Sequence, residues 1–83
     1  MNEEFVIARQ SKKYGTFEYL MRLTTDVSDE QRTWWPFETD LYEFVYLNGR
    51  EARQLLWILR TTDDTQKYVF TAIEISQLER MRA

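Results

Sequence analysis

Residues 41–59 read LYEFVYLNGREARQLLWIL, the most densely apolar stretch of the chain, which the pair Asn48-Gly49 interrupts. The interpretation that we favour places a strand over 41–47 and a helix after it. Asn48 is then the N-cap residue, and Glu51, three residues later, completes a capping box. Apolar residues recur on one face of that helix at the spacing i, i+3, i+4 and i+7: Ala52, Leu55, Leu56 and Leu59.

Two other interpretations of this stretch stay open. In one, residues 40–47 form the helix, Gly49 is its C′ residue, and 54–62 form a strand that pairs with 66–75. In the other, Asn48-Gly49 is a type I′ hairpin turn. All three keep an antiparallel sheet covered by helix. The predicted fold class is therefore α+β, with a small antiparallel sheet of about four strands, one main helix and a short C-terminal helix.

The N-terminal part of the chain predicts a β-hairpin. Residues 4–10 favour a strand, 11–15 a polar hairpin loop with a glycine, and 16–25 a second strand. Apolar and polar residues alternate along 16–25, which is typical of a half-buried antiparallel strand, and Leu20 is the apolar exception on the polar face. The predicted core consists of Phe17, Tyr19, Met21, Leu23, Leu56 and Leu59.

The C-terminal part predicts one more strand and a helix. Residues 61–66 read as a polar turn and 67–75 as a strand, since they are rich in β-branched and aromatic residues. Ser76 and Glu79 form a second capping-box pattern, which predicts a helix over 77–83. Leu78 and Met81 are the residues available to anchor it.

Residues 26–40 are the longest predicted connection. Ser28 and Gln31 have the spacing of a cap for one helical turn, and Pro36 ends any helix before Trp35. A connection of this length in a small domain is often functional. Of its aromatic residues, Trp34 is expected to be exposed, while Trp35 and Phe37 serve either the core or a surface.

Composition limits the classes of protein to consider. The 83 residues predict a single compact domain over 1–83, and aromatic residues make up 16% of them. There is no cysteine and no histidine, so disulfides and sulfur or imidazole metal sites are excluded. The chain has no apolar run long enough to span a membrane, and MNEEF lacks the features of a signal peptide. We expect a cytoplasmic protein without membrane contact.

The sequence does not predict an enzyme. Without histidine and cysteine, the commonest general base and the strongest nucleophile are missing. The carboxylate pairs Glu38/Asp40 and Asp63/Asp64 are better explained as loop and turn residues. No phosphate-binding loop or metal-binding spacing is present. We therefore predict no catalytic residue, no metal site and no cofactor.

Nucleic-acid binding is the alternative function. Four tyrosines are candidate stacking platforms: Tyr14, Tyr42, Tyr46 and Tyr68. Four cations are candidate phosphate contacts: Arg50, Arg53, Arg60 and Lys67. A net charge of −3 weighs against this function, because binding to phosphates usually needs a clearly basic face.

Charge is distributed unevenly, and this favours protein binding. Residues 26–43 contain six acids and one base, a net charge of −5, whereas the rest of the chain is +2. Aromatic residues supply binding energy at interfaces and carboxylates steer association with a basic partner. The predicted partner-binding residues are Asp29, Glu30, Trp34, Trp35, Phe37, Glu38 and Asp40.

These observations predict a non-catalytic protein-binding domain whose partner carries a basic surface; a homodimer is a further alternative. In size, acidity and lack of catalytic residues the chain is similar in kind to small phage-encoded inhibitors of host proteins, including anti-restriction and anti-CRISPR proteins, and to immunity proteins and antitoxins. No stretch matches a family motif, so the likeness is one of size and composition. It implies a protein that acts by occupying a surface.

Overall fold

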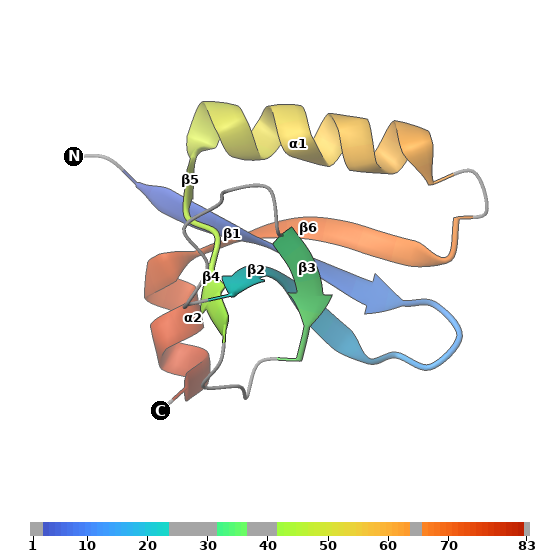
Figure 1. The fold of residues 1–83 in the computed structure, drawn as a ribbon, viewed down its shortest axis with the longest axis horizontal. Helices are drawn as coiled ribbons and strands as arrows, with labels where there is room; N and C mark the ends of the chain where they lie inside the picture. Colours follow the sequence, from blue (N-terminus) through green and yellow to red (C-terminus); the bar gives the residue numbers. More distant parts are fainter. Residues whose placement is uncertain (1–2, 24–31, 37–41, 64–65, 83) are drawn as a thin grey trace.

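The protein is an antiparallel sheet with a helix on each face (Figure 1). The computed structural model describes residues 3–23, 32–36, 42–63 and 66–82. Its elements are β1 (Glu4–Ser11), β2 (Phe17–Leu23), β3 (Arg32–Trp35), β4 (Tyr42–Phe44), β5 (Leu47–Asn48), α1 (Gly49–Thr62), β6 (Tyr68–Glu74) and α2 (Ile75–Arg82). The predicted α+β class, with one main helix and a short C-terminal helix, is confirmed.

Strand β1 lies at the centre of the sheet and has partners along both edges. On one edge it pairs with β6 over its length, from Phe5 opposite Glu74 to Ser11 opposite Tyr68. On the other edge it pairs with β2 near its C-terminal end and with β5 near its N-terminal end. Both faces of β1 are covered as well, so Val6, Ile7 and Ala8 have no exposed surface.

The turn between β1 and β2 is the hairpin that the sequence predicts. Gly15 has a φ of 72°, a left-handed conformation that glycine adopts without a Cβ clash. Its N–H donates to the Ser11 carbonyl at 2.8 Å, and the Ser11 hydroxyl accepts from the Tyr14 N–H. The turn is thus closed by local hydrogen bonds.

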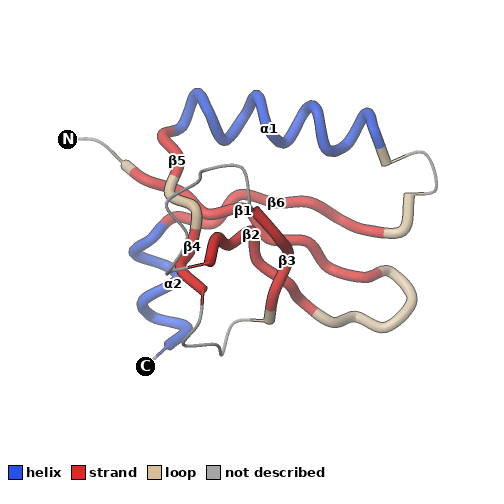
Figure 2. The backbone as a smooth tube through the Cα atoms, viewed as in Figure 1, coloured by secondary structure: helices blue, strands red, loops and turns tan. Residues whose placement is uncertain are grey.

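Beyond Tyr19, strand β2 changes partners. It pairs with β1 up to the Ala8–Tyr19 pair, and then with β4, where Met21 lies opposite Phe44. The chain continues from β4 into β5, which takes the place beside β1 that β2 has left (Figure 2). Strand β3 pairs with β2 from Tyr19 to Arg22.

Helix α1 begins where the capping box predicts. The Asn48 side chain accepts from the Glu51 N–H at 2.8 Å, and the Glu51 carboxylate accepts from the Asn48 N–H at 3.1 Å. The favoured order of strand and then helix is therefore confirmed, except that the strand part is divided into β4 and β5 and residue 41 lies outside the described residues. A helix over 40–47 and a type I′ turn at Asn48-Gly49 are both wrong.

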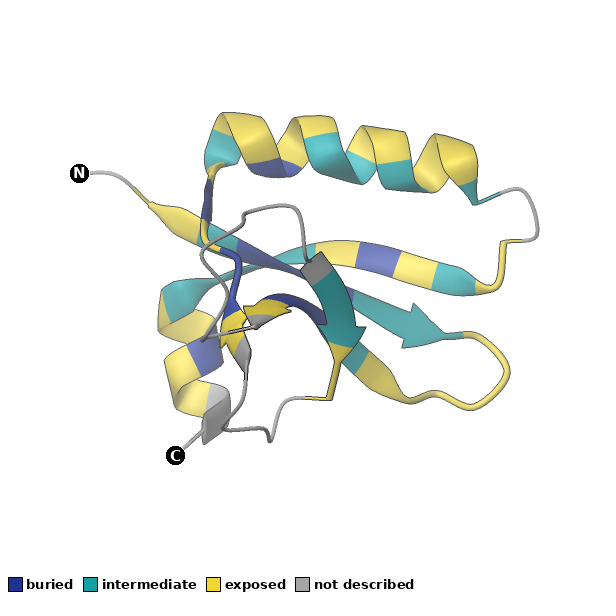
Figure 3. Cartoon of the chain, in the orientation of Figure 1, coloured by how far each residue is buried: buried dark blue, intermediate teal, exposed yellow. Residues whose placement is uncertain are grey.

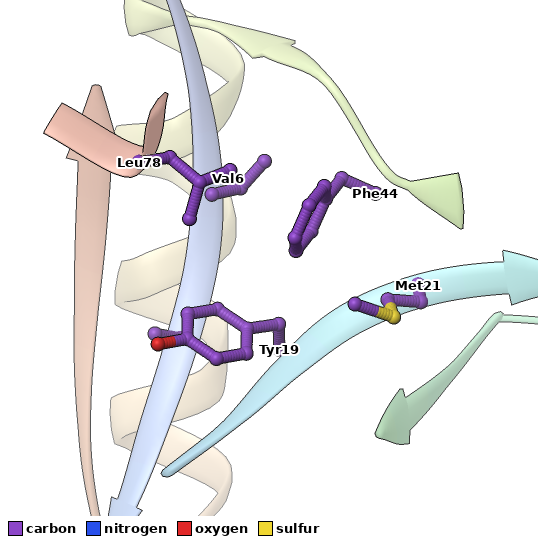
Figure 4. Close-up of a cluster of buried hydrophobic side chains, with 6 residues drawn as sticks. Val6, Tyr19, Met21, Phe44 and Leu78 are labelled. Atoms are coloured by element: carbon purple, nitrogen blue, oxygen red, sulfur yellow. The ribbon is translucent and has the colours of Figure 1, made fainter. Parts of the chain in front are cut away.

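The two faces of the sheet bury separate apolar clusters. On one face, Leu78 of α2 packs with β1, β2 and β4 (Figure 4), in a cluster of Val6, Ala8, Tyr19, Met21, Phe44 and Leu78. The rings of Tyr19 and Phe44 meet edge to face, 5.8 Å apart, and burial raises the pKa of the Tyr19 phenol. On the other face, α1 covers a second cluster, whose buried members are Ile7, Leu20, Val45, Leu47 and Ala52.

The structure corrects two predictions about the core. Phe17 is 47% exposed, because it lies at the start of β2, opposite Gln10 and at the end of the sheet away from Leu78. Leu20 is buried, because α1 covers the face on which the sequence pattern predicts polar residues. Tyr19 and Met21 are buried as predicted, and Leu56 and Leu59 are partly buried. The side chains of Leu23 and Met81 lie outside the described residues.

Two predictions about secondary structure are also wrong in part. Residues 32–35 of the predicted connection form strand β3, since aromatic and β-branched residues there fill the free edge of β2. Helix α2 begins at Ile75, directly after β6, so Ser76 lies inside the helix and is not its N-cap. The cap predicted from Ser28 and Gln31 lies outside the described residues.

Truncation of Ile7 tests the two-sided burial of β1. Ile7→Ala should lower the free energy of unfolding by about 2–5 kcal/mol, because it leaves a cavity under α1. Urea unfolding measures the loss. Val69→Ala, at a residue that is 50% exposed, is the control and should change stability by about 0.5 kcal/mol or less. Equal effects of the two changes would contradict the burial of β1.

Removal of the cap tests the start of α1. Asn48→Ala deletes the side-chain acceptor for the Glu51 N–H and should cost about 0.5–2 kcal/mol of stability. Asn48→Asp keeps an acceptor and should retain most of it. Urea unfolding of the two variants measures the difference, and an Asn48→Ala protein as stable as the Asp variant would mean that the cap contributes little.

Candidate binding surface on helix α1

Helix α1 exposes two large apolar side chains. Its inner side packs on the sheet through Ala52 and partly buried leucines, whereas Trp57 is 69% and Ile58 48% exposed. Figure 3 shows the buried and half-buried residues of α1 on the side toward the sheet and the exposed ones on the opposite side. The α1 outer face, as we call it, comprises Arg50, Arg53, Gln54, Trp57, Ile58, Arg60 and Thr61, all exposed.

Three arginines surround Trp57. Arg50 and Arg53 precede it by seven and four residues, and Arg60 follows it by three, so all lie on the same side of the helix. One guanidinium nitrogen of Arg60 donates to the Phe70 carbonyl of β6 at 2.9 Å. Within the described part of the chain, Arg50 and Arg53 make no ion pair. Their charges are therefore available to a partner.

The surface beside these arginines is hollowed. A shallow hollow of about 470 Å³ is lined by Arg53, Gln54, Trp57 and Ile58. A second groove, of about 450 Å³, runs between α1 and the sheet and is also bordered by Arg53. Its remaining lining residues are Glu3, Phe5, Asn48, Gly49, Ala52, Leu56 and Ala72. Arg53 thus stands between two mainly apolar depressions.

Of the predicted acidic and aromatic partner-binding residues, the structure places only Trp34 and Trp35. Both lie in β3, where their side chains point to opposite faces of the sheet. Trp35 is 37% exposed. Trp34 is half-buried, so the prediction that Trp34 is the exposed one is wrong. Five predicted residues lie outside the described part: Asp29, Glu30, Phe37, Glu38 and Asp40.

Trp34 is held by an arginine and a neighbouring ring. The Arg9 guanidinium lies 4.7 Å from the Trp34 ring centroid and 4.2 Å from that of Tyr68, and pairs with the Glu18 carboxylate at 2.8 Å. The Phe70 ring is 5.9 Å from Trp34. Cation–π contacts of this kind stabilise folded proteins. Trp34 and Tyr68 therefore have a structural role beside the α1 cluster.

The predicted nucleic-acid residues are only partly brought together. Arg50, Arg53 and Arg60 share α1, whereas Lys67 is exposed on the segment that leads into β6. Tyr14 lies in the β1–β2 turn and is 73% exposed, and Tyr46 follows β4 and is 52% exposed. The side chain of Tyr42 lies outside the described residues. The three arginines of α1 surround Trp57, which is not one of the four predicted tyrosines.

The described carboxylates form no metal-binding cluster. Across residues 3–23, 32–36, 42–63 and 66–82, no three acidic side chains cluster in a way that could hold a metal ion. Asp63 has structural contacts: its N–H donates to the Leu59 carbonyl, and its carboxylate accepts from the Tyr68 N–H. No buried side-chain polar atom in the same ranges lacks a partner. Asp64 lies outside them.

Sequence reasoning missed Trp57 and Ile58. Once a helix is placed over 50–60, the face defined by Ala52, Leu55, Leu56 and Leu59 leaves both residues on the other side. Apolar residues opposite the core face of a predicted helix are thus the signal that identifies this surface.

Comparison of the sequence with protein-family models and curated proteins, and of the fold with solved structures, gives no match. None of the helices described is long and apolar enough to cross a membrane.

Truncation of the two tryptophans separates a surface residue from a structural one. Trp57→Ala should change the free energy of unfolding by about 0.5 kcal/mol or less, because the ring is mostly in water. Trp34→Ala should cost roughly 2 kcal/mol or more, because it removes ring contacts and the Arg9 stack. Urea unfolding measures both. A larger loss for Trp57 than for Trp34 would assign Trp57 to the core.

Proposed function

We propose that this chain is a non-catalytic protein-binding domain that uses the α1 outer face to cover a surface of its partner. The observation that carries the proposal is the exposure of Trp57 beside Ile58 on a helix whose other side is packed. Contiguous exposed apolar side chains rimmed by polar residues mark interaction sites, and tryptophan and arginine are enriched among the residues that dominate binding energy.

The surface is also attached to the rest of the fold at several points. Capping by Asn48 fixes the start of α1, the hydrogen bond from Arg60 to Phe70 ties its last turn to β6, and the inner side packs on the sheet. A preformed face loses little conformational entropy on binding. We propose that the protein acts in the cytoplasm as an inhibitor or adaptor, in the manner of small phage-encoded inhibitors that occupy a host surface.

The acidic segment adds a second, separate element to the proposal. Residues 26–43 carry a net charge of −5, and Trp35 of β3 lies exposed within this segment. A basic region of the partner remains our prediction for this segment. Replacing Asp29, Glu30 and Glu38 with Asn or Gln should then mainly slow association and weaken its salt dependence, since charges at an interface rim act on encounter.

Nucleic-acid binding is the second candidate. The arrangement that favours it is Trp57 between Arg50, Arg53 and Arg60, because proteins that bind single strands combine aromatic stacking with cations for the phosphates. Ile58 and the apolar hollow beside Arg53 favour a protein partner, since a phosphate backbone would leave both in contact with water.

Affinity capture with matched aromatic variants tests the proposal. The tagged protein is incubated with native lysate before and after nuclease treatment, and the captured partner is then titrated. Trp57→Ala should weaken binding by about 2 kcal/mol or more, the loss expected at a hot spot. Tyr14→Ala removes an equally exposed ring on the hairpin and should leave binding unchanged.

Two results would decide against the α1 outer face as a protein-binding surface. Retained capture by Trp57→Ala, with Tyr14→Ala equally active, would place the interface elsewhere. Loss of the partner on nuclease treatment, together with steeply salt-dependent binding to labelled single-stranded DNA, would favour the nucleic-acid function.

A further inference from the structure

We infer that the partner presents to the α1 outer face an amphipathic helix with carboxylates along one flank. This inference rests on the proposed function, since it names the class of protein segment that α1 binds. Two features of the face carry it: the spacing of its central side chains and the asymmetry of its charge.

The central side chains have the spacing of a helix-packing seam. Gln54, Trp57, Ile58 and Thr61 recur at i, i+3, i+4 and i+7 and are all exposed. Rows at this spacing form the ridges and grooves into which a second helix packs, at an interaxial distance of about 8–10 Å. The 14 residues of α1 offer about 21 Å of axis to such a partner.

Positive charge lies at one end and along one flank of this seam. Arg53 and Arg60 border it on one side, and Arg50, four residues before Gln54 and seven before Trp57, continues the seam at its N-terminal end. On the other side lies Glu51, whose carboxylate is engaged in the capping box. A partner helix that packs along the seam would therefore meet the guanidinium groups of Arg50 and Arg53, whereas that of Arg60 already donates to the Phe70 carbonyl. Carboxylates on the facing flank of the partner helix complement Arg50 and Arg53, because guanidinium binds carboxylate in a planar, two-point geometry.

The shape of the surface favours a helix over an extended strand. In the described residues β6 pairs only with β1, but backbone groups on its other edge already have hydrogen-bond partners. The Phe70 carbonyl accepts from the Arg60 side chain, and the Tyr68 N–H donates to the Asp63 carboxylate. Strand addition needs those backbone groups free. The side chains of α1 are open to a partner without any such rearrangement.

Two matched peptides test the inference. Each has roughly 21 residues and three heptads with Leu and Ala on one face. One carries Glu along a single flank, and the other has Gln at the same positions. Fluorescence anisotropy of the labelled peptides with the full chain at low salt should show about tenfold tighter binding of the Glu peptide, the sum expected for two ion pairs, with Arg50 and Arg53.

Charge reversal locates the contact. Arg50→Glu with Arg53→Glu should abolish the preference for the Glu peptide. Lys12→Glu with Lys13→Glu makes the same change in net charge on the exposed β1–β2 turn and should keep it. Thermal unfolding of both double variants checks that each is folded.

Three outcomes would overturn the inference: no binding of either peptide, equal binding of both, or loss of the preference in the lysine variant as well. Tighter binding of a single-stranded thymidine oligonucleotide, removed by Arg50→Glu with Arg53→Glu, would assign the arginines to nucleic acid. If Trp57→Ala still fails to capture the cellular partner while the two peptides bind equally, the proposed function stands and the acidic flank of the partner helix is refuted.

Discussion

The burial of β1 on both faces and along both edges is the constraint on which this fold depends. Val6, Ile7 and Ala8 have no exposed surface, so every neighbour of the strand must be supplied from elsewhere in a short chain. Strand β2 pairs with β1 only up to Tyr19 and pairs with β4 beyond it. Strand β5 then pairs with the rest of that edge of β1. Asn48 ends β5 opposite Glu4 and caps α1. Completion of the sheet therefore also fixes where α1 starts and which of its sides faces out.

A domain of this size needs its large rings inside, since small domains bury a modest share of their surface. The protein follows that rule with Trp34, which closes the sheet face beside α1 with Phe70 and Arg9. It departs from the rule with Trp57, which lies in water on the most regular element of the fold. The exposure of Trp57 has no structural explanation in the core, and it adds a solubility cost that a binding role would offset.

Local sequence patterns predicted what depends on near neighbours. The capping box at Asn48, a strand within 16–25 and the strand at 67–75 are each encoded within a few residues, and the structure has the cap, β2 and β6 there. Burial at Phe17 and Leu20 was predicted wrongly, because it depends on which helix reaches which part of the sheet. Strand β3 was missed because its partner is β2, across a long connection. The exposure of Trp57 could have been predicted from the sequence, because a helical projection of 50–60 places it on the side opposite the leucines.

The last turn of α1 connects the α1 outer face with the edge of the sheet. Arg60 belongs to the α1 outer face and also donates to Phe70 on the outer edge of β6, while Asp63 holds the Tyr68 N–H. Natural proteins cover such edges to prevent pairing with other chains. The same helix therefore does two things: it occupies the hydrogen-bonding groups on the edge of β6, and it exposes the side chain of Trp57. Recognition through the side chains of α1 is then compatible with a sheet that does not add strands from other molecules.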